Sequence, residues 1–188
     1  MLEPLKNFLR KRSLKKFADT EPTGILPVSR IRSAVAVIDV EDPSCDDCKL
    51  ALQAFFRENG IKGEIIFFDF RKIENGERLI TSVANTVLRK DLDWCGRLSR
   101  EKTHLLRANE TDLFLSLIPG TPFPLEHLTK CVRARFRAGR AQLPGNPFDL
   151  VVTDPAGQPL NQKESFEAMR SLFAKINCFR TESSVNPR

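Results

Sequence analysis

The chain has 188 residues, of which 41% are hydrophobic, and a formal net charge of +6. This size and hydrophobic content predict one folded domain. No apolar run approaches the ~20 residues that a membrane-crossing helix needs, and no secretory signal is recognisable, so we expect a cytoplasmic protein. The five cysteines are odd in number and scattered, unlike the disulfide framework of a small secreted domain.

The N-terminal segment is basic, with eight Lys or Arg against three acidic residues in positions 1–32. We expect a helix from Pro4 to Phe17, followed by a linker to residue 32. A second basic strip, Arg133 to Arg140, contains four Arg and no acid. An ordinary solvated basic face is the favoured interpretation, because neither segment carries a nucleic-acid motif. Peripheral association with an anionic membrane or with nucleic acid through these segments remains an alternative.

Residues 33–72 follow the pattern strand, turn, helix, strand. The β-branched run from Ala34 to Val40 predicts the first strand, and the apolar run from Glu64 to Phe70 predicts the second. We expect Ser44 to begin the helix in a capping box with Asp47, and Gly60 to end it. Apolar side chains at helical spacing predict one buried stripe on this helix: Cys48, Leu52, Phe55 and Phe56.

Strands and helices are predicted to alternate over the rest of the chain. The expected strands are 79–88, 112–118, 133–139 and 148–153, and the expected helices are 99–107, 125–132 and 161–177. This alternation predicts a three-layer αβα, Rossmann-like domain with a mainly parallel sheet. We therefore divide the chain into a basic N-terminal helix and linker (1–32), a single α/β domain (33–177) and a disordered tail (178–188).

In a parallel sheet of this kind, ligands bind beyond the carboxyl ends of the strands. Asp39, Thr121 and Asp154 are predicted to follow strand ends, and Trp94, the only Trp, lies in a connecting segment. We expect these four residues to be the candidate ligand-binding positions. For Trp94, anchoring its long connection on the sheet is the favoured role, and stacking on a ligand is the alternative.

Cys45 and Cys48 stand at the start of the first predicted helix, where thioredoxin-type enzymes keep their dithiol. The helix N-terminus favours a thiolate, but the intervening Asp46 and Asp47 oppose it. A thioredoxin-type site also needs a proline loop before a later strand, whereas the loop at Pro119 follows its strand. We expect two incidental cysteines, with a thiol-disulfide oxidoreductase as the alternative and half of a zinc shell as a third interpretation.

Other catalytic signatures are missing. The chain has no G-x-x-x-x-G-K-[ST], no G-x-G-x-x-G after a strand and no G-x-S-x-G elbow. Ser116, His127 and Asp149 could form a triad, but nothing in their spacing favours one, and we expect His127 at the surface or as a capping residue. We predict no cofactor and no metal.

Five segments occur in order that together resemble a small bacterial family known only as a domain of unknown function. They begin at Lys90, Thr111, Phe123, Ala134 and Phe148, and the resemblance covers roughly residues 33–176. It implies a cytosolic α/β domain and brings no catalytic residues with it. The C-x-x-C does not belong to the family pattern, and Cys95 stands where an aromatic residue is usual. Both departures weaken a family-wide role for the thiols.

The absent signatures and this resemblance together favour a non-enzymatic binding or scaffold protein, whose ligand or partner lies at the carboxyl ends of the strands. The thiol-disulfide oxidoreductase is the runner-up, and peripheral association with membrane or nucleic acid is the third hypothesis.

Overall fold

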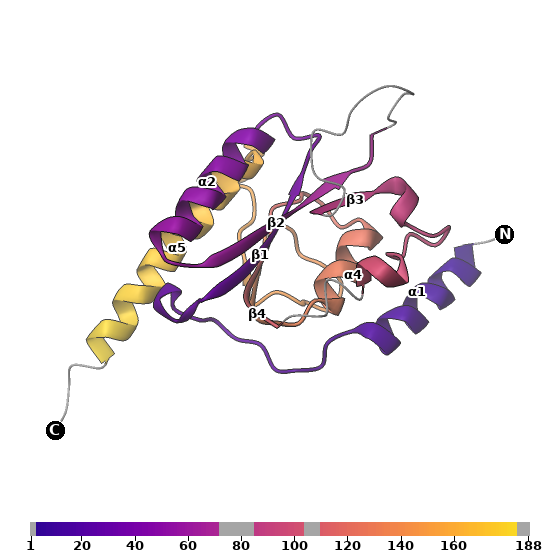
Figure 1. Cartoon of the computed structure of the whole chain (residues 1–188), viewed down its shortest axis with the longest axis horizontal. Helices are drawn as coiled ribbons and strands as arrows, with labels where there is room; N and C mark the ends of the chain where they lie inside the picture. Colours follow the sequence, from indigo (N-terminus) through magenta and orange to yellow (C-terminus); the bar gives the residue numbers. More distant parts are fainter. Residues whose placement is uncertain (1–2, 72–84, 104–109, 184–188) are drawn as a thin grey trace.

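Parallel strands form a single sheet in the order β3-β2-β1-β4-β5-β6 in the computed structural model, which describes residues 3–71, 85–103 and 110–183 (Figure 1). The predicted αβα architecture with an N-terminal helix is thus confirmed. The strands are β1 (Ser33–Asp39), β2 (Lys62–Asp69), β3 (Thr86–Leu88), β4 (Thr111–Ser116), β5 (Ala134–Gly139) and β6 (Leu150–Val151). The order reverses between β1 and β4, the place where such sheets commonly bind ligands.

Helices cover both faces of the sheet. They are α1 (Glu3–Phe17), α2 (Cys45–Glu58), α4 (Phe123–Cys131) and α5 (Gln162–Ser183), with short 3-10 turns η1 (Val28–Arg30) and η3 (Arg89–Asp91). Helices α2 and α5 pack on one face, and α4 packs on the other with α1 beside it (Figure 1). A further helical turn occupies residues 100–103.

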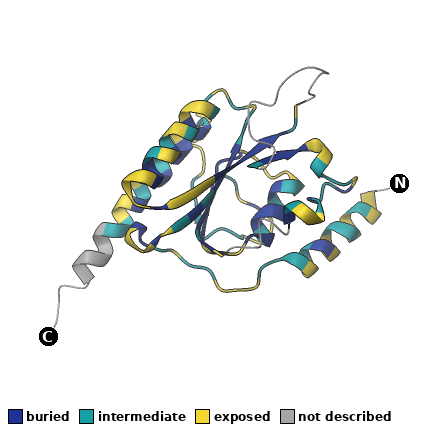
Figure 2. Ribbon diagram, viewed as in Figure 1, coloured by how far each residue is buried: buried dark blue, intermediate teal, exposed yellow. Residues whose placement is uncertain are grey.

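Two apolar clusters, one on each face, hold the layers together. The stripe predicted on α2 is confirmed, because Cys48, Leu52, Phe55 and Phe56 are all buried against the sheet and α5. On the other face, Phe114 of β4 packs with Leu125 and Leu128 of α4. Figure 2 shows that the centre of the sheet is buried, that β2 begins with exposed residues, and that exposed residues lie on the outer sides of α2 and α5. Burial on both faces explains why the central strands are continuous apolar runs.

The ends of several helices and strands differ from the predictions. Ser44 stands at the N-cap position of α2, but the capping box is wrong: its Oγ donates to Asp42 Oδ1 at 2.7 Å instead of capping the helix. Gly60 ends the turn after α2 with a φ of +63°, as predicted. In the strand predicted for 148–153, only Leu150 and Val151 pair with a neighbouring strand. In the strand predicted for 79–88, Thr86–Leu88 pair with β2, and residues 79–84 lie outside the described residues.

The last predicted helix is longer than expected. Helix α5 continues to Ser183, beyond the predicted end at residue 177. The helix predicted for 99–107 begins at residue 100, and its end lies outside the described residues.

Candidate functional site

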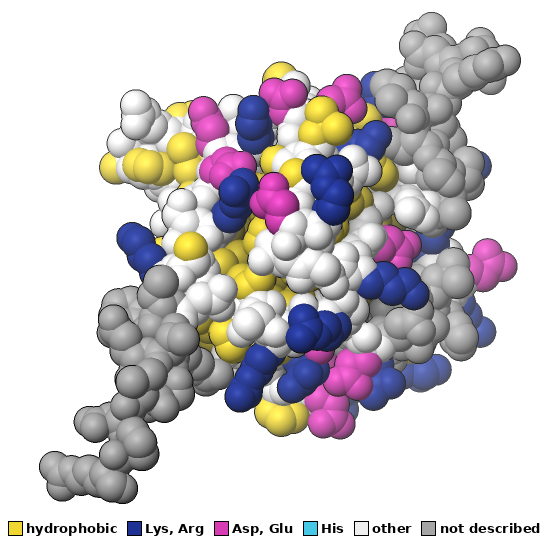
Figure 3. Space-filling model, turned by 60° about the vertical axis from the view of Figure 1, so that its left-hand side comes forward, with side chains coloured by type: hydrophobic (Ala, Val, Ile, Leu, Met, Phe, Trp, Pro, Cys, Tyr) yellow, Lys and Arg dark blue, Asp and Glu magenta, His cyan; other side chains and the backbone are white. Residues whose placement is uncertain are grey.

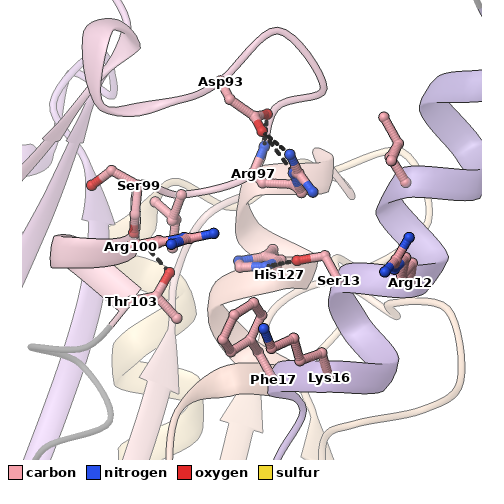
Figure 4. A pocket seen from close by; sticks show the side chains of 12 residues that line it. Arg12, Ser13, Lys16, Phe17, Asp93, Arg97, Ser99, Arg100, Thr103 and His127 are labelled. Atoms are coloured by element: carbon pink, nitrogen blue, oxygen red, sulfur yellow. Dashed lines mark hydrogen bonds and ion pairs between the residues drawn. The ribbon is translucent and has the colours of Figure 1, made fainter.

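A cavity of about 930 Å³ lies between α1, α4 and the segment 93–103 (Figure 4). One wall is α1, the opposite wall is the segment that follows η3, and His127 of α4 lies between them. Its described lining residues are Leu9, Arg12, Ser13, Lys16, Phe17, Asp93, Arg97, Leu98, Ser99, Arg100, Thr103 and His127. The volume is within the range of small-molecule sites, about 300–1,000 Å³.

The α1 wall is held on α4 by polar contacts. The Arg10 Nε donates to the carbonyl of Cys95 at 2.7 Å, and its guanidinium lies 4.6 Å from the centroid of the Phe123 ring. Ser13 contacts His127 one turn further along both helices. This docking leaves Arg12 and Lys16, four residues apart on α1, on the side that faces the cavity.

The opposite wall is shaped by Asp93. Its Oδ1 accepts the backbone N–H groups of Cys95 and Arg97, and its Oδ2 accepts the Arg97 Nε at 2.6 Å. Although burial opposes ionisation, these hydrogen bonds and the Arg97 charge keep the pKa of Asp93 below its ordinary value. Gly96 completes the turn with a φ of +80°, and Leu98 anchors the segment in the core. The turn therefore presents Arg97 and Arg100 at a fixed place.

His127 is buried, with 1% of its surface exposed, so the predicted surface or capping position is wrong. The reason is that α1 covers this face of α4. Its Nε2 lies 2.9 Å from Ser13 Oγ, while both ring nitrogens lie 3.9 Å from Cys131 Sγ. Burial, followed by the Arg97 charge, lowers the pKa of His127 to about 4. The imidazole is therefore neutral at pH 7 and accepts or donates a hydrogen bond without carrying charge.

The Ser13–His127 pair is not a nucleophile and base in a recognisable triad. A triad requires a third group, usually a carboxylate, that orients the other ring nitrogen, and here the nearest recorded partner of Nδ1 is the Cys131 thiol. The triad of Ser116, His127 and Asp149 does not assemble around His127 either. The Asp149 carboxylate accepts the Thr23 hydroxyl and the Arg137 backbone N–H. The Ser116 Oγ is buried and has no hydrogen-bond partner among the residues that the structure describes.

The cavity is strongly electropositive. Its described lining includes Arg12, Lys16, Arg97 and Arg100 but a single acid, Asp93, which already binds Arg97. Within the described part of the chain, no ion pair involves Arg12, Lys16 or Arg100. In Figure 4, Lys16 and Arg100 reach into the same space from opposite sides. By contrast, the face seen in Figure 3 intersperses basic with acidic side chains.

These residues suit an anionic ligand. Guanidinium groups donate paired hydrogen bonds to phosphate or carboxylate oxygens, and Leu9, Phe17 and Leu98 offer apolar surface to the body of a small molecule. Among the described residues, no group of three or more His, Cys, Asp or Glu is arranged to hold a metal ion.

At the carboxyl ends of β1 and β5, two of the strand ends where we expect a ligand, side chains make hydrogen bonds within the protein. The Gln162 side chain at the start of α5 accepts the Asp39 N–H at 2.7 Å and donates to the Asp39 carbonyl at 2.8 Å. Arg140 is buried and donates to the Leu160 carbonyl and, at 3.4 Å, to the Asp154 carboxylate. Residues 160–162 thus lie between Asp39 and Asp154, the two predicted positions that the structure brings to one region.

Burial raises the pKa of Asp39 above its ordinary value, and the nearby Asp42 and Asp69 carboxylates add to this effect. Asp69 differs because Arg71 binds it at 2.8 Å and lowers its pKa. Thr121 is exposed in the loop after β4. Trp94 is 54% exposed, so it does not anchor its connection on the sheet, and it belongs to the Asp93–Arg97 turn without lining the cavity.

The two cysteines of the C-x-x-C do not have the electrostatics of a reactive dithiol. Burial raises the pKa of Cys45 to about 11, helped by the Asp46, Asp39 and Asp42 charges, and burial raises that of Cys48 to about 12. Both are free thiols in the structure. A nucleophilic cysteine needs the opposite shift, toward a thiolate at neutral pH.

The strip 133–140 is a solvated basic face only in part, because two of its four Arg side chains are buried. Arg137 is buried and pairs at 3.0 Å with Asp19, while Arg140 is buried against residues 154–160. Arg133 and Arg135 are exposed, and Arg135 pairs with Asp112 at 3.1 Å. The strip is therefore basic and solvated only in its first half, because the residues around Asp19 and Asp154 cover the second half. None of the helices in the described part of the chain combines the length and apolar character needed to cross a bilayer.

The sequence does not bring the basic residues of the cavity together, although it draws attention to His127. Arg12 and Lys16 are 80 or more positions away from Arg97 and Arg100, so no local motif joins them. The excess of basic residues in positions 1–32 is the one signal for them in the sequence, and it is equally typical of a solvated surface.

A family model covers residues 6–174, so the chain belongs to DUF6913, a family of unknown function. The matched region includes nearly all of α1 and both walls of the cavity. No curated protein and no solved structure matches the chain.

Proposed function

We propose that this protein binds a small anionic molecule, carrying a phosphate or carboxylate group, in the cavity between α1, α4 and residues 93–103. The observation that carries the proposal is the convergence of Arg12, Lys16 and Arg100 on one cavity without an ion-pair partner among the described residues. A non-enzymatic binding role agrees with the sequence-based hypothesis. Its place differs from the carboxyl ends of the strands, because the basic side chains gather between α1, α4 and residues 93–103.

Charge and shape both support this role. Four cationic groups around one cavity concentrate anions there, since field lines are focused in a concave site with low-dielectric walls. The neutral Ser13–His127 pair adds polar atoms without opposing an anion. A small inorganic ion would occupy only part of the cavity and would leave its apolar residues without a contact. A phosphorylated or carboxylated metabolite with a ring or chain fits the lining best.

The test is a binding titration at low ionic strength by calorimetry. Inorganic phosphate, pyrophosphate, citrate and adenosine 5′-monophosphate serve as probes. The variant Lys16→Gln/Arg100→Gln should weaken binding of the tightest probe by at least about tenfold, because it removes two charge-assisted hydrogen bonds.

The control variant is Arg57→Gln/Lys175→Gln. It removes the same two charges from exposed positions on α2 and α5, on the opposite face of the sheet. It should retain affinity within about twofold, as expected for distant screened charges. An equal loss of affinity in both variants would mean that binding depends on the net charge of the protein and not on this cavity. Absence of binding by every probe would also refute the proposal.

A further inference from the structure

We infer that α1 is a ligand-dependent wall: an anion in the cavity and the docked position of α1 stabilise each other. The inference rests on the proposed function, since it concerns the regulation of the same site. It comes from how α1 is attached, from the charges on its cavity side and from the place where the chain is anchored behind it.

Helix α1 is held weakly by apolar contacts. Ser13 is its one buried residue among those described, while Leu5 is 48% and Phe8 60% exposed. Figure 2 shows the same contrast between α1 and the buried inner sides of α2 and α5. Its attachment to the body consists chiefly of Arg10 on Cys95 and Phe123, and Ser13 on His127. Such contacts stabilise a helix by much less than a buried apolar face does.

The chain behind α1 is fixed independently. The Asp19 N–H donates to the Lys130 carbonyl at 2.7 Å, and the Asp19 carboxylate pairs with the buried Arg137 at 3.0 Å. The anchor therefore lies two residues after the helix ends at Phe17. Helix α1 can leave α4 by rotation about residues 18–19 without disturbing the sheet.

Charges across the cavity disfavour the empty docked state. Arg12 and Lys16 on α1 face the wall that carries Arg97 and Arg100, and Asp93 is the single described acid between them. Like charges on two walls repel, and an anion between them turns this repulsion into attraction to both. When α1 leaves, Arg12 and Lys16 leave with it, so the anion binds the docked state better. By linkage, the ligand must then increase the docked population by the same factor.

The experiment is hydrogen–deuterium exchange of the full chain with and without pyrophosphate, at ionic strength matched with NaCl, beside a pyrophosphate titration. We expect the amides of α1 to exchange about fivefold or more slowly when the ligand is bound, a typical coupling factor. The amides of α2, on the other face, should not change. The variant Phe123→Leu removes the ring beneath Arg10 without changing charge or a lining residue. It should speed exchange of α1 and weaken pyrophosphate binding together.

The matched control is Phe8→Leu, at an exposed position of α1, which should alter neither measurement. Pyrophosphate that binds the wild-type protein without protecting α1 would overturn the coupling and leave the binding function intact. Unchanged affinity in a Phe123→Leu protein whose α1 exchanges faster would do the same. Failure of pyrophosphate to bind at all would refute this inference through the function on which it rests.

Discussion

Ser13 Oγ lies 2.9 Å from His127 Nε2, although 114 positions separate the two residues. This buried bond joins the N-terminal helix to the helix that follows the centre of the sheet. It places one neutral polar pair beneath four cations, at the point where α1, α4 and the 93–103 segment meet.

The first prediction concerns pH. The folded pKa of His127 is about 4, below the ordinary 6.5 that applies to the unfolded chain. Between these values the unfolded state binds more protons, so the stability contributed by neutral His127 is complete above pH 6.5 and is lost as pH falls toward 4. At pH 5 the unfolding free energy should be lower than at pH 7.5 by roughly 2 kcal/mol from this residue alone.

Urea denaturation at both pH values measures this difference, and His127→Asn should remove it. Asp93, Glu126 and Arg97 surround the ring and stay in both proteins, so the wild-type minus variant difference isolates the imidazole. An identical pH dependence in the two proteins would show that His127 is not buried as described.

The position of His127 shows which part of the site the sequence could predict. Regular apolar stripes identified α2 and the central strands, because burial against a sheet leaves a periodic signal. Helix α1 has no such stripe, and its docking depends on Arg10 and Ser13 contacts that are visible only after folding. Without the position of α1, the sequence predicts His127 at the surface and gives no reason to place Arg12 near Arg97.

The short outer strands show the same limit for the fold. Strand β6 pairs through two residues with β5, although the apolar run around it is longer. The contacts of the neighbouring segments, and not the propensity of its own residues, decide where an edge strand ends. Here the chain turns away after β6 so that Asp154 pairs with Arg140. The number of strands was therefore predictable from the sequence, whereas the length of the outer ones was not.

The second prediction concerns the anchor behind α1. Both side chains of the Asp19–Arg137 pair are 7% exposed, and Arg137 Nε has no hydrogen-bond partner among the described residues. Asp19→Ala should lower the unfolding free energy by about 3 kcal/mol, because it leaves a buried cation unpaired. Asp19→Ala/Arg137→Met should recover most of that loss.

Guanidinium denaturation measures both variants. The exposed pair Lys163–Asp47, 3.5 Å apart, supplies the control, and Asp47→Ala should change stability by less than about 0.5 kcal/mol. A double variant as unstable as the single one would mean that the loss arises from packing around residue 19.

The third prediction concerns the contact between the start of α5 and the carboxyl end of β1. Gln162 is fully buried and binds both backbone groups of Asp39. Gln162→Ala should lower the unfolding free energy by about 2 kcal/mol, the sum of two net hydrogen bonds. Gln158→Ala, at an exposed position four residues earlier, should have little effect. Thermal and chemical denaturation compare them, and equal stability of both variants would argue that this end of β1 is open to water or ligand.

The fourth prediction concerns the thiols. Because the pKa of Cys45 is raised to about 11 from an ordinary 9.0, its thiolate is scarce at neutral pH. Alkylation of native Cys45 by iodoacetamide at pH 7.5, followed by mass spectrometry, should be at least about tenfold slower than alkylation in the urea-unfolded chain, where burial and the neighbouring carboxylates no longer act.

Asp46→Asn serves as the electrostatic control. It removes the carboxylate charge that raises the pKa of Cys45 most, and it should accelerate the reaction without changing the burial of the thiol. Faster alkylation in the native protein than in the unfolded chain would instead favour the dithiol hypothesis. Cys48, which is more deeply buried and has a pKa of about 12, should react more slowly than Cys45. A catalytic dithiol would show the same order, because its resolving thiol is also shielded from external reagents. The comparison of native with unfolded Cys45 therefore separates a structural pair from a catalytic one, since only a catalytic thiol is activated by the fold.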